Sequence, residues 1–206
     1  LNCWTDEARD NGNWNDDSDK VDPDCQVQSP VSTVIEDFES GDNVPEATVE
    51  IFYGDKVEGS ADQISASDTS GQISFESMPT CDPLSYRVST DPELEMTVVT
   101  IRAHMIYDYA QTITENFQSV STATYAIIPS LLGVSVDEDK GVLAGTAFDC
   151  NGDPIEGVQV IVRAEDGSYP EQEIRYFKSS WPNRDQPWTS DDGLWVAVNI
   201  PPGRVT

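Results

Sequence analysis

One pattern of strands and turns occurs twice in this chain, and this repetition constrains the fold more than any other sequence feature. Phe38 is followed seven to ten residues later by Pro-Glu-Ala-Thr and then by the alternating run Val-Glu-Ile. Phe148 is followed at the same offsets by Ile-Glu-Gly-Val and then by Gln-Val-Ile. Further along, Gly71 and Gly193 each follow a polar turn and each precede a proline by eight residues. The chain is therefore expected to fold as two related modules.

Apolar and polar residues alternate in the first module with a period near two, which is typical of β-strands with one buried face. Clusters of Gly, Asp, Asn and Ser separate the strand-like runs and indicate turns. Segments 96–109 and 122–136 also have extended character, and no longer stretch carries an apolar stripe of helical period. The predicted class is all-β. The strand-like runs are residues 32–38, 47–53, 72–75 and 84–88.

The second module contains, in order, Gly-Thr-Ala-Phe, Asn-Gly-Asp-Pro-Ile-Glu-Gly-Val-Gln-Val, Thr-Ser-Asp-Asp-Gly and Asn-Ile-Pro-Pro-Gly, within residues 145–203. This stretch resembles the carboxypeptidase regulatory-like domain, a transthyretin-like β-sandwich. The first copy departs from the pattern, since Glu46-Ala47 replaces Glu-Gly and Thr80 follows the Met-Pro pair. The resemblance implies two tandem immunoglobulin- or transthyretin-like β-sandwiches of the kind found in bacterial surface proteins. Such modules are usually non-catalytic, although a fold does not fix a function.

Three segments are expected: an acidic, cysteine-bracketed segment at 1–30, a first β-sandwich at 31–138 and a second at 139–206. The second copy has only five residues after Pro201, which is short for a complete sandwich. The second module is therefore expected to lack its last strand or strands and to have an open sheet edge, which invites an added strand. Residues 26–35, of this chain or of a neighbour, are the candidate donor. The alternative is a chain that was cut at this end.

The charge of the chain is strongly one-sided, with 38 acidic and 11 basic side chains and a net charge of −27. Such a field repels phosphate backbones and anionic headgroups, so nucleic acids and lipid surfaces are poor partners. It attracts divalent cations, although an acidic surface also serves simply to keep a protein solvated. No stretch reaches the roughly 20 apolar residues of a membrane span. The sequence begins without a signal peptide and is expected to be a mature extracellular or cell-surface product.

Four cysteines without a CxxC pair or a neighbouring histidine fit disulfides better than zinc. Of the three possible pairings, Cys3–Cys25 with Cys81–Cys150 is favoured, because the first pair brackets one compositionally distinct segment. Disulfides indicate an extracellular or periplasmic setting. The alternative is four reduced, buried thiols in a cytosolic protein.

The N-terminal segment carries side-chain oxygens at a spacing that imitates a calcium-binding EF-hand loop. The match is partial, because Asp16 replaces the turn glycine and the shorter Asp22 replaces the bidentate glutamate. Calcium is the one cofactor that the sequence suggests; a disulfide, or docking against a module, are other ways to order this segment. The candidate ligands are Asn11, Asn13, Asn15, Asp17, Asp19 and Asp22.

Between its matched halves, the second copy is 12 residues longer than the first, and the extra length falls in an aromatic arm at 168–188. The arm has a formal charge of zero in a chain that is otherwise acidic. Aromatic surface with arginine is typical of sites that bind sugars or proteins. The alternative is a long connection whose aromatic side chains cap the sandwich. The candidate binding residues are Tyr169, Tyr176, Trp181 and Trp188.

No catalytic signature such as HExxH, GxSxG or a P-loop is present. The only histidine, His104, is expected to be an ordinary strand residue. The sequence therefore predicts a non-enzymatic extracellular structural protein that assembles into an oligomer or filament by strand addition, with other copies of itself or other surface proteins as partners. The alternative is a module for adhesion that binds carbohydrate or protein through the aromatic arm, with polysaccharide as the partner.

Overall fold

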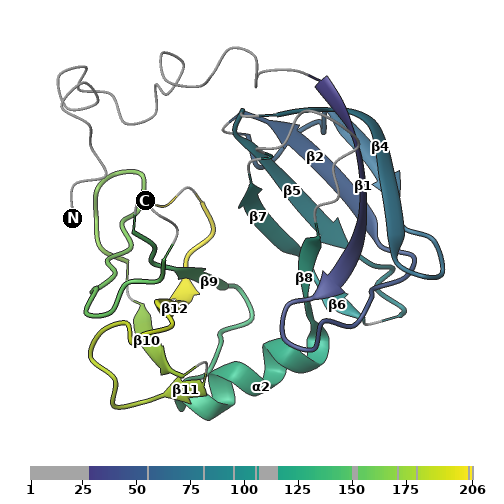
Figure 1. Cartoon of the computed structure of the whole chain (residues 1–206). Helices are drawn as coiled ribbons and strands as arrows, with labels where there is room; N and C mark the ends of the chain where they lie inside the picture. The colour runs from purple at the N-terminus through teal and green to yellow at the C-terminus, as the bar shows by residue number, and fades with distance from the viewer. Residues whose placement is uncertain are drawn as a thin grey trace, which may run out of the picture. The chain divides into compact units, whose positions relative to one another are not determined.

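The computed structural model describes residues 28–54, 56–80, 82–94, 96–104, 106, 116–149, 153–170, 172–179, 181–203 and 205. These residues belong to two compact units, which meet in sequence between Tyr125 and Ala126 (Figure 1). Both units are built mainly of β-strands, so the predicted all-β class is confirmed. The four cysteines and the six candidate calcium ligands lie outside the described residues, and the disulfides and the calcium site remain predictions.

The first unit is a sandwich of two four-stranded sheets. In one sheet, β1 pairs antiparallel with β4 and parallel with β8. In the other, β2 pairs antiparallel with β3 on one edge and with β5 on the other. The first sheet has the order β4 (Gln72–Pro79), β1 (Gln28–Asp37), β8 (Phe117–Ser121), β6 (Thr97–Val98). The second has the order β3 (Gln63–Ala66), β2 (Thr48–Tyr53), β5 (Leu84–Ser89), β7 (Thr100–His104).

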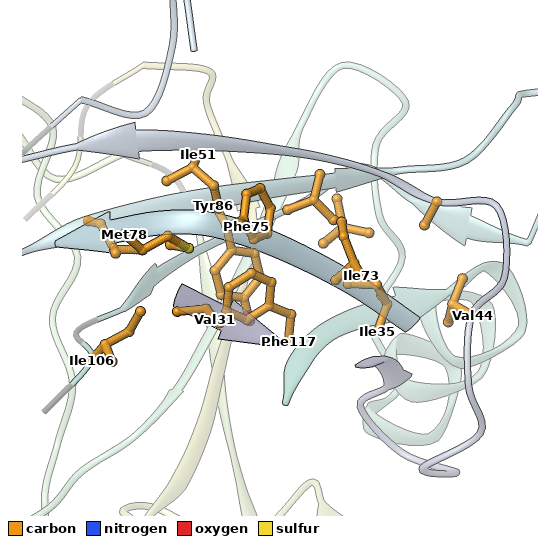
Figure 2. Close-up of a cluster of buried hydrophobic side chains, with 14 residues drawn as sticks. Val31, Ile35, Val44, Ile51, Ile73, Phe75, Met78, Tyr86, Ile106 and Phe117 are labelled. Atoms are coloured by element: carbon orange, nitrogen blue, oxygen red, sulfur yellow. The ribbon is translucent and has the colours of Figure 1, made fainter. Parts of the chain in front are cut away.

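The core of this sandwich consists of alternate side chains from the two sheets, as the period of two predicts. In β1 every second residue from Ser29 to Asp37 is buried. Figure 2 shows how the apolar side chains of β1, β4 and β8 meet those of β2 and β5. The rings of Tyr86 and Phe117 stack across the core with their centroids 4.5 Å apart. Burial of these apolar surfaces is the main stabilising term for the unit.

The second unit contains one four-stranded sheet with an apolar cluster on each face. Alternate residues of the central strand point to opposite faces, so Val196 and Val198 contact Leu132 and Val134 on one side. Ala197 faces the other side, where it packs with Val162. The strand order is β11 (Trp181–Asn183), β10 (Glu173–Lys178), β12 (Leu194–Ile200), β9 (Gly141–Thr146).

The prediction of an extended segment at 122–136 is wrong, because Thr122–Leu132 forms helix α2. Ser121 caps its first turn, since the N–H of Thr124 donates to Ser121 Oγ at 3.1 Å. The helix ends at Leu132, and the next residue, Gly133, adopts a φ of 71° and donates its N–H to the carbonyl of Ser130. The N–H of Val134 donates to the carbonyl of Pro129, which completes a Schellman motif.

The hydrogen bonds confirm the internal repeat and correct its register. In the first module, Val44 N–H donates to the carbonyl of Ile35, and Ile35 N–H donates to that of Gly71. In the second module, Ile155 N–H donates to the carbonyl of Ala147, and Ala147 N–H donates to that of Gly193. The paired positions are therefore Ile35 with Ala147, Val44 with Ile155, and Gly71 with Gly193.

Phe38 and Phe148, from which the repeat was first aligned, are not equivalent. The isolated bridge of Glu36 with Asn43 corresponds to that of Phe148 with Pro154, so Phe148 matches Glu36. The predicted length of the insertion also changes. Two equivalent hydrogen bonds span 20 residues in the first module and 31 in the second, so the insertion between them is 11 residues long and not 12.

Candidate functional site

In the second module, segment 158–163 is extended and lies beside the core; it is called the edge segment. Val160 and Val162 point into the core, and Gln159, Ile161 and Arg163 point to solvent. Ile161 is 59% exposed. The side chains thus alternate as in a β-strand, yet the segment forms no ladder with another described strand.

One side of the edge segment has no neighbouring strand, and its backbone groups bond mainly to side chains. Val158 N–H donates to Thr189 Oγ1 at 2.9 Å, and Thr189 N–H donates to the carbonyl of Val158 at 3.0 Å. Val160 N–H donates to the hydroxyl of Tyr176 at 3.0 Å. The side-chain amide of Gln172 donates to the carbonyl of Val162 at 2.9 Å. These contacts keep the segment extended, because they satisfy the backbone groups that a strand partner would otherwise satisfy.

The opposite edge is open. Among the described residues, the backbone N–H and C=O groups of Gln159 and Ile161 have no hydrogen-bond partner. At the end of the segment, Ala164 forms an isolated antiparallel bridge with Val205. A row of unpaired backbone groups beside an apolar core is the usual template for an added strand.

The first module shows what covers the same edge when it is paired. Its strand β2 corresponds to the edge segment, since Ala47 and Val158 make equivalent hydrogen bonds. On one edge β2 pairs with β3, and on the other it pairs with β5 at six positions, from Thr48 with Ser89 to Tyr53 with Leu84. The side-chain contacts of Thr189 and Tyr176 take the place of β3. The open edge corresponds to the side that β5 covers.

Of the donor predicted from sequence, residues 26–35, the described part is 28–35, and it belongs to a strand of the first unit. Residues 28–37 form β1, which pairs with β4 on one side and β8 on the other. Val31 and Ile35 lie fully inside the first sandwich. Removing this strand would open the first core, so the structure rules out the described part of the predicted donor.

The aromatic arm places its candidate binding residues in different surroundings. Tyr176 is only 6% exposed and belongs to the interior. Trp181, in β11, is 72% exposed, and Tyr169 and Trp188 are also exposed. The guanidinium of Arg163 lies 5.2 Å from the centre of the Tyr169 ring. Within the described part of the chain, no ring contact joins any two of the four residues, so they do not form one aromatic platform.

His104 lies in β7 as predicted and packs edge-on against Tyr86 and Phe117, with ring centroids 5.7 Å apart in both pairs. Burial, together with the positive charge of Arg102, lowers the pKa of His104 to about 4. The imidazole is therefore neutral near pH 7 and serves as part of an aromatic cluster. No three His, Cys, Asp or Glu side chains come together as a metal site among the residues that the structure describes.

Asp37 joins the end of β1 to the start of helix α2. Its carboxylate accepts the N–H groups of Glu39, Ser40 and Ser121 at 2.7–3.1 Å. Burial opposes ionisation, but the hydrogen bonds donated by Ser40 and Ser121 outweigh it and hold the pKa of Asp37 below its usual value. These contacts join segments of the first unit that are far apart in sequence, which assigns Asp37 to the framework of that unit.

Comparisons with known proteins give structural similarities only. No protein-family model and no curated protein matches the chain. Among solved structures, the Bacillus anthracis TIE protein matches with 16% identity and a TM-score of 0.34, over 82% of this chain and 26% of that protein. A mutant of the shaft pilin spaA from Lactobacillus rhamnosus GG matches with 11% identity and a TM-score of 0.34, over 47% and 46% of the two chains. A streptococcal ancillary pilin matches with 11% identity and a TM-score of 0.32, over 87% and 52%.

The chain therefore spans about a quarter of the first of these proteins and about half of the other two. Within the described residues, no helix combines the length and the apolar character that a membrane span requires.

Proposed function

We propose that this chain is a non-catalytic structural protein of the extracellular space or the cell surface, made of tandem β-sandwich modules at 31–138 and 139–206. The observation that carries this proposal is the repeated hydrogen-bond frame around Ser67 and Thr189. A chain that repeats one rigid module gains length and display surface without a new active site. The resemblance of residues 145–203 to the carboxypeptidase regulatory-like domain supports the same role.

The chemistry of the titratable groups supports a structural role. The one histidine is neutral and packed among aromatic rings. The net charge of −27 suits a protein that stays soluble outside the cell and does not adhere to anionic membranes. The four cysteines fit the same compartment, with Cys3–Cys25 and Cys81–Cys150 as the proposed pairs.

Surface labelling of intact cells that produce the chain tests this proposal. A membrane-impermeant amine reagent is expected to label the lysines of the chain before lysis to the same extent as after lysis. A cytosolic protein of the same cells serves as the control and should be labelled only after lysis. Labelling of the chain that appears only after lysis would place the protein inside the cell and contradict the proposal.

A second candidate function is carbohydrate or protein binding by the aromatic arm, and the exposure of Trp181 favours it. A stacking site on this arm should lose its ligand when Trp181 or Trp188 is changed to Ala. A polysaccharide array probed with the wild type and with both variants decides between the two functions. Retention that both substitutions abolish supports the arm as a binding site, and retention that is equal in all three proteins contradicts it.

Calcium binding by the N-terminal segment also remains a proposal. Ligand binding to the folded state raises the melting temperature. We therefore expect a higher Tm in calcium than in chelator for the wild type, and no difference after Asp17 and Asp19 are both changed to Asn. Equal melting temperatures of the wild type in the two solutions would contradict a calcium site.

A further inference from the structure

We propose that Lys178 and Trp181, in the hairpin of β10 and β11, form a binding site for an acidic sugar residue of a polysaccharide. The indole ring of Trp181 stacks on the sugar ring, and the ammonium group of Lys178 binds the carboxylate of the same sugar. This inference rests on the second candidate function, carbohydrate binding by the aromatic arm. It deepens that function by naming two residues and one class of ligand.

The hairpin holds Lys178 and Trp181 on one face of the sheet. Lys178 ends β10, Trp181 begins β11, and the two residues are directly paired (Figure 1). Directly opposed residues of an antiparallel pair have their side chains on the same face, with Cβ atoms about 4.5–5.5 Å apart. Two residues earlier on this face, Tyr176 is buried and anchors the hairpin in the core. The two side chains are therefore brought together by the backbone before any ligand arrives, as in a preorganised site.

Both side chains are free to contact a ligand. Trp181 is 72% exposed, and Lys178 is also exposed. Among the residues that the structure describes, the ammonium of Lys178 has no ion pair and the indole N–H of Trp181 has no acceptor. Two arginines of the same arm are engaged, since Arg175 pairs with Glu173 and Arg184 donates to carbonyls at the end of α2. Lys178 is thus a cation of the arm that a ligand can use.

The chemistry of the pair fits a sugar that carries a carboxylate. An exposed indole offers a flat apolar face for the C–H face of a pyranose ring, and its N–H is a donor for a hydroxyl group. An ammonium group forms a strong, charge-assisted hydrogen bond with a carboxylate. In a uronic acid the carboxylate is attached to the ring itself. One such sugar residue therefore presents both groups to two neighbouring side chains.

The charge around the pair also favours an anionic ligand. Arm 168–188 has a formal charge of zero, whereas the whole chain has a net charge of −27. Repulsion from exposed acidic groups farther away is screened over about 8 Å at physiological ionic strength, so the nearest contacts dominate. An acidic peptide also offers carboxylates, but it carries them on flexible side chains without a ring to stack on the indole. The acidic sugar is therefore the occupant that uses both residues.

A titration of the whole chain with trigalacturonate, followed by NMR, tests this proposal. Backbone amide signals of the β10–β11 hairpin report binding. The control ligand is the fully methyl-esterified trisaccharide, which keeps the three sugar rings and removes their charge. Wild-type protein is expected to bind the acid at least about threefold more tightly than the ester, which is the size of effect that an exposed ion pair supplies.

Three variants assign the contacts. Lys178→Gln should bind the acid and the ester equally, because only the ion pair distinguishes them. Lys140→Gln changes the net charge by the same amount at another lysine without a partner among the described residues, and should keep the preference for the acid. Trp181→Ala should weaken the binding of both ligands at least about tenfold, through loss of stacking. Because Lys178 and Trp181 are exposed, their variants should keep the fold.

Each other outcome would overturn part or all of the proposal. Equal affinity of the wild type for the acid and the ester would remove the acidic specificity. Binding of triglutamate as tight as that of trigalacturonate would assign the pair to acidic peptides instead of sugars. No binding of either trisaccharide would overturn the site. The polysaccharide array includes neutral glycans and reports on the arm as a whole, so failure of the acidic site is distinguishable from failure of the second candidate function.

Discussion

The hydroxyl groups of Ser67 and Thr189 make equivalent hydrogen bonds in the two modules. Each is buried, each accepts one backbone N–H, and each donates to the carbonyl three residues before that N–H. Each residue also donates its own N–H back to the segment that its hydroxyl holds. The groups contacted are Ala47 N and Val44 O by Ser67, and Val158 N and Ile155 O by Thr189. The shared frame makes the two modules versions of one unit.

Removal of either hydroxyl should destabilise its own module. Ser67→Ala and Thr189→Ala each leave a buried N–H and a buried carbonyl without this partner, which costs about 1–3 kcal/mol. Urea denaturation, followed by probes in each module, measures the loss. Ser67→Thr and Thr189→Ser keep a hydroxyl and should retain most of the stability. A loss below about 0.5 kcal/mol for both alanine variants would show that the hydroxyls do not hold the turns.

Gly193 and Gly157 both have positive φ values, 65° and 86°, but they differ in the space around them. A Cβ atom at Gly193 would lie 2.6 Å from the carbonyl oxygen of Ala147, and at Gly157 it would meet nothing within 4 Å. Gly157→Ala should therefore cost about 1–2 kcal/mol, from backbone strain alone. Gly193→Ala should cost clearly more, because the backbone must also move. Equal losses in denaturation midpoints would contradict the close approach at Gly193.

Acid should weaken the first module through His104. Its pKa is about 4 in the folded chain and 6.5 as a free side chain, so the unfolded chain binds more protons between these values. The free energy of unfolding is therefore expected to fall as the pH is lowered from 6.5 to about 4, by on the order of 2 kcal/mol. His104→Gln should remove this part of the pH dependence. The comparison belongs above pH 4, because Asp37 contributes at lower pH. Parallel pH profiles for the two proteins would contradict the packing of His104.

Tyr176 and Trp181 belong to the same arm, but their substitution should affect stability to different extents. Tyr176→Phe removes the hydroxyl that accepts the N–H of Val160, so the second module should lose about 1 kcal/mol. Trp181→Ala changes an exposed side chain and should alter stability by less than about 0.5 kcal/mol. Thermal unfolding of both variants measures the difference. A large loss for Trp181→Ala would show that its ring packs against the protein.

Strand positions in the first module follow from the sequence, because one buried face imposes a period of two. The predicted runs at 32–38, 47–53, 72–75 and 84–88 overlap β1, β2, β4 and β5. The register of the repeat does not follow in the same way. Phe38 and Phe148 look equivalent as letters, but both rings are about half exposed and neither is fixed by the core. Hydrogen bonds, which the sequence does not display, set the true alignment.

Helix α2 forms although the helix propensity of part of its sequence is low. Ile127, Ile128 and Pro129 have low helix propensity. The capping signals were present, with Ser121 before the first turn and Gly133 after the last. The packing of Ile128 and Leu132 against the sheet of the second unit outweighs the weak helix propensity.

The extended conformation of the edge segment could not be foreseen from the sequence. The contacts of Tyr176 and Gln172 with the edge segment come from the insertion, which has no counterpart in the first module. They make the segment extended without a neighbour on the inner edge, and this arrangement depends on tertiary structure.

Residue-resolved hydrogen exchange of the free chain tests the central claim most directly, that one unit occurs twice and that Gln159 and Ile161 of the second copy are unpaired among the described residues. In the first module, amides along β2 from Val49 to Phe52 should all exchange slowly, because both edges are paired. In the second, Val158 and Val160 should exchange slowly while Gln159 and Ile161 exchange at least about a hundredfold faster. Uniform protection across 158–161, or uniform fast exchange in both segments, would contradict the account.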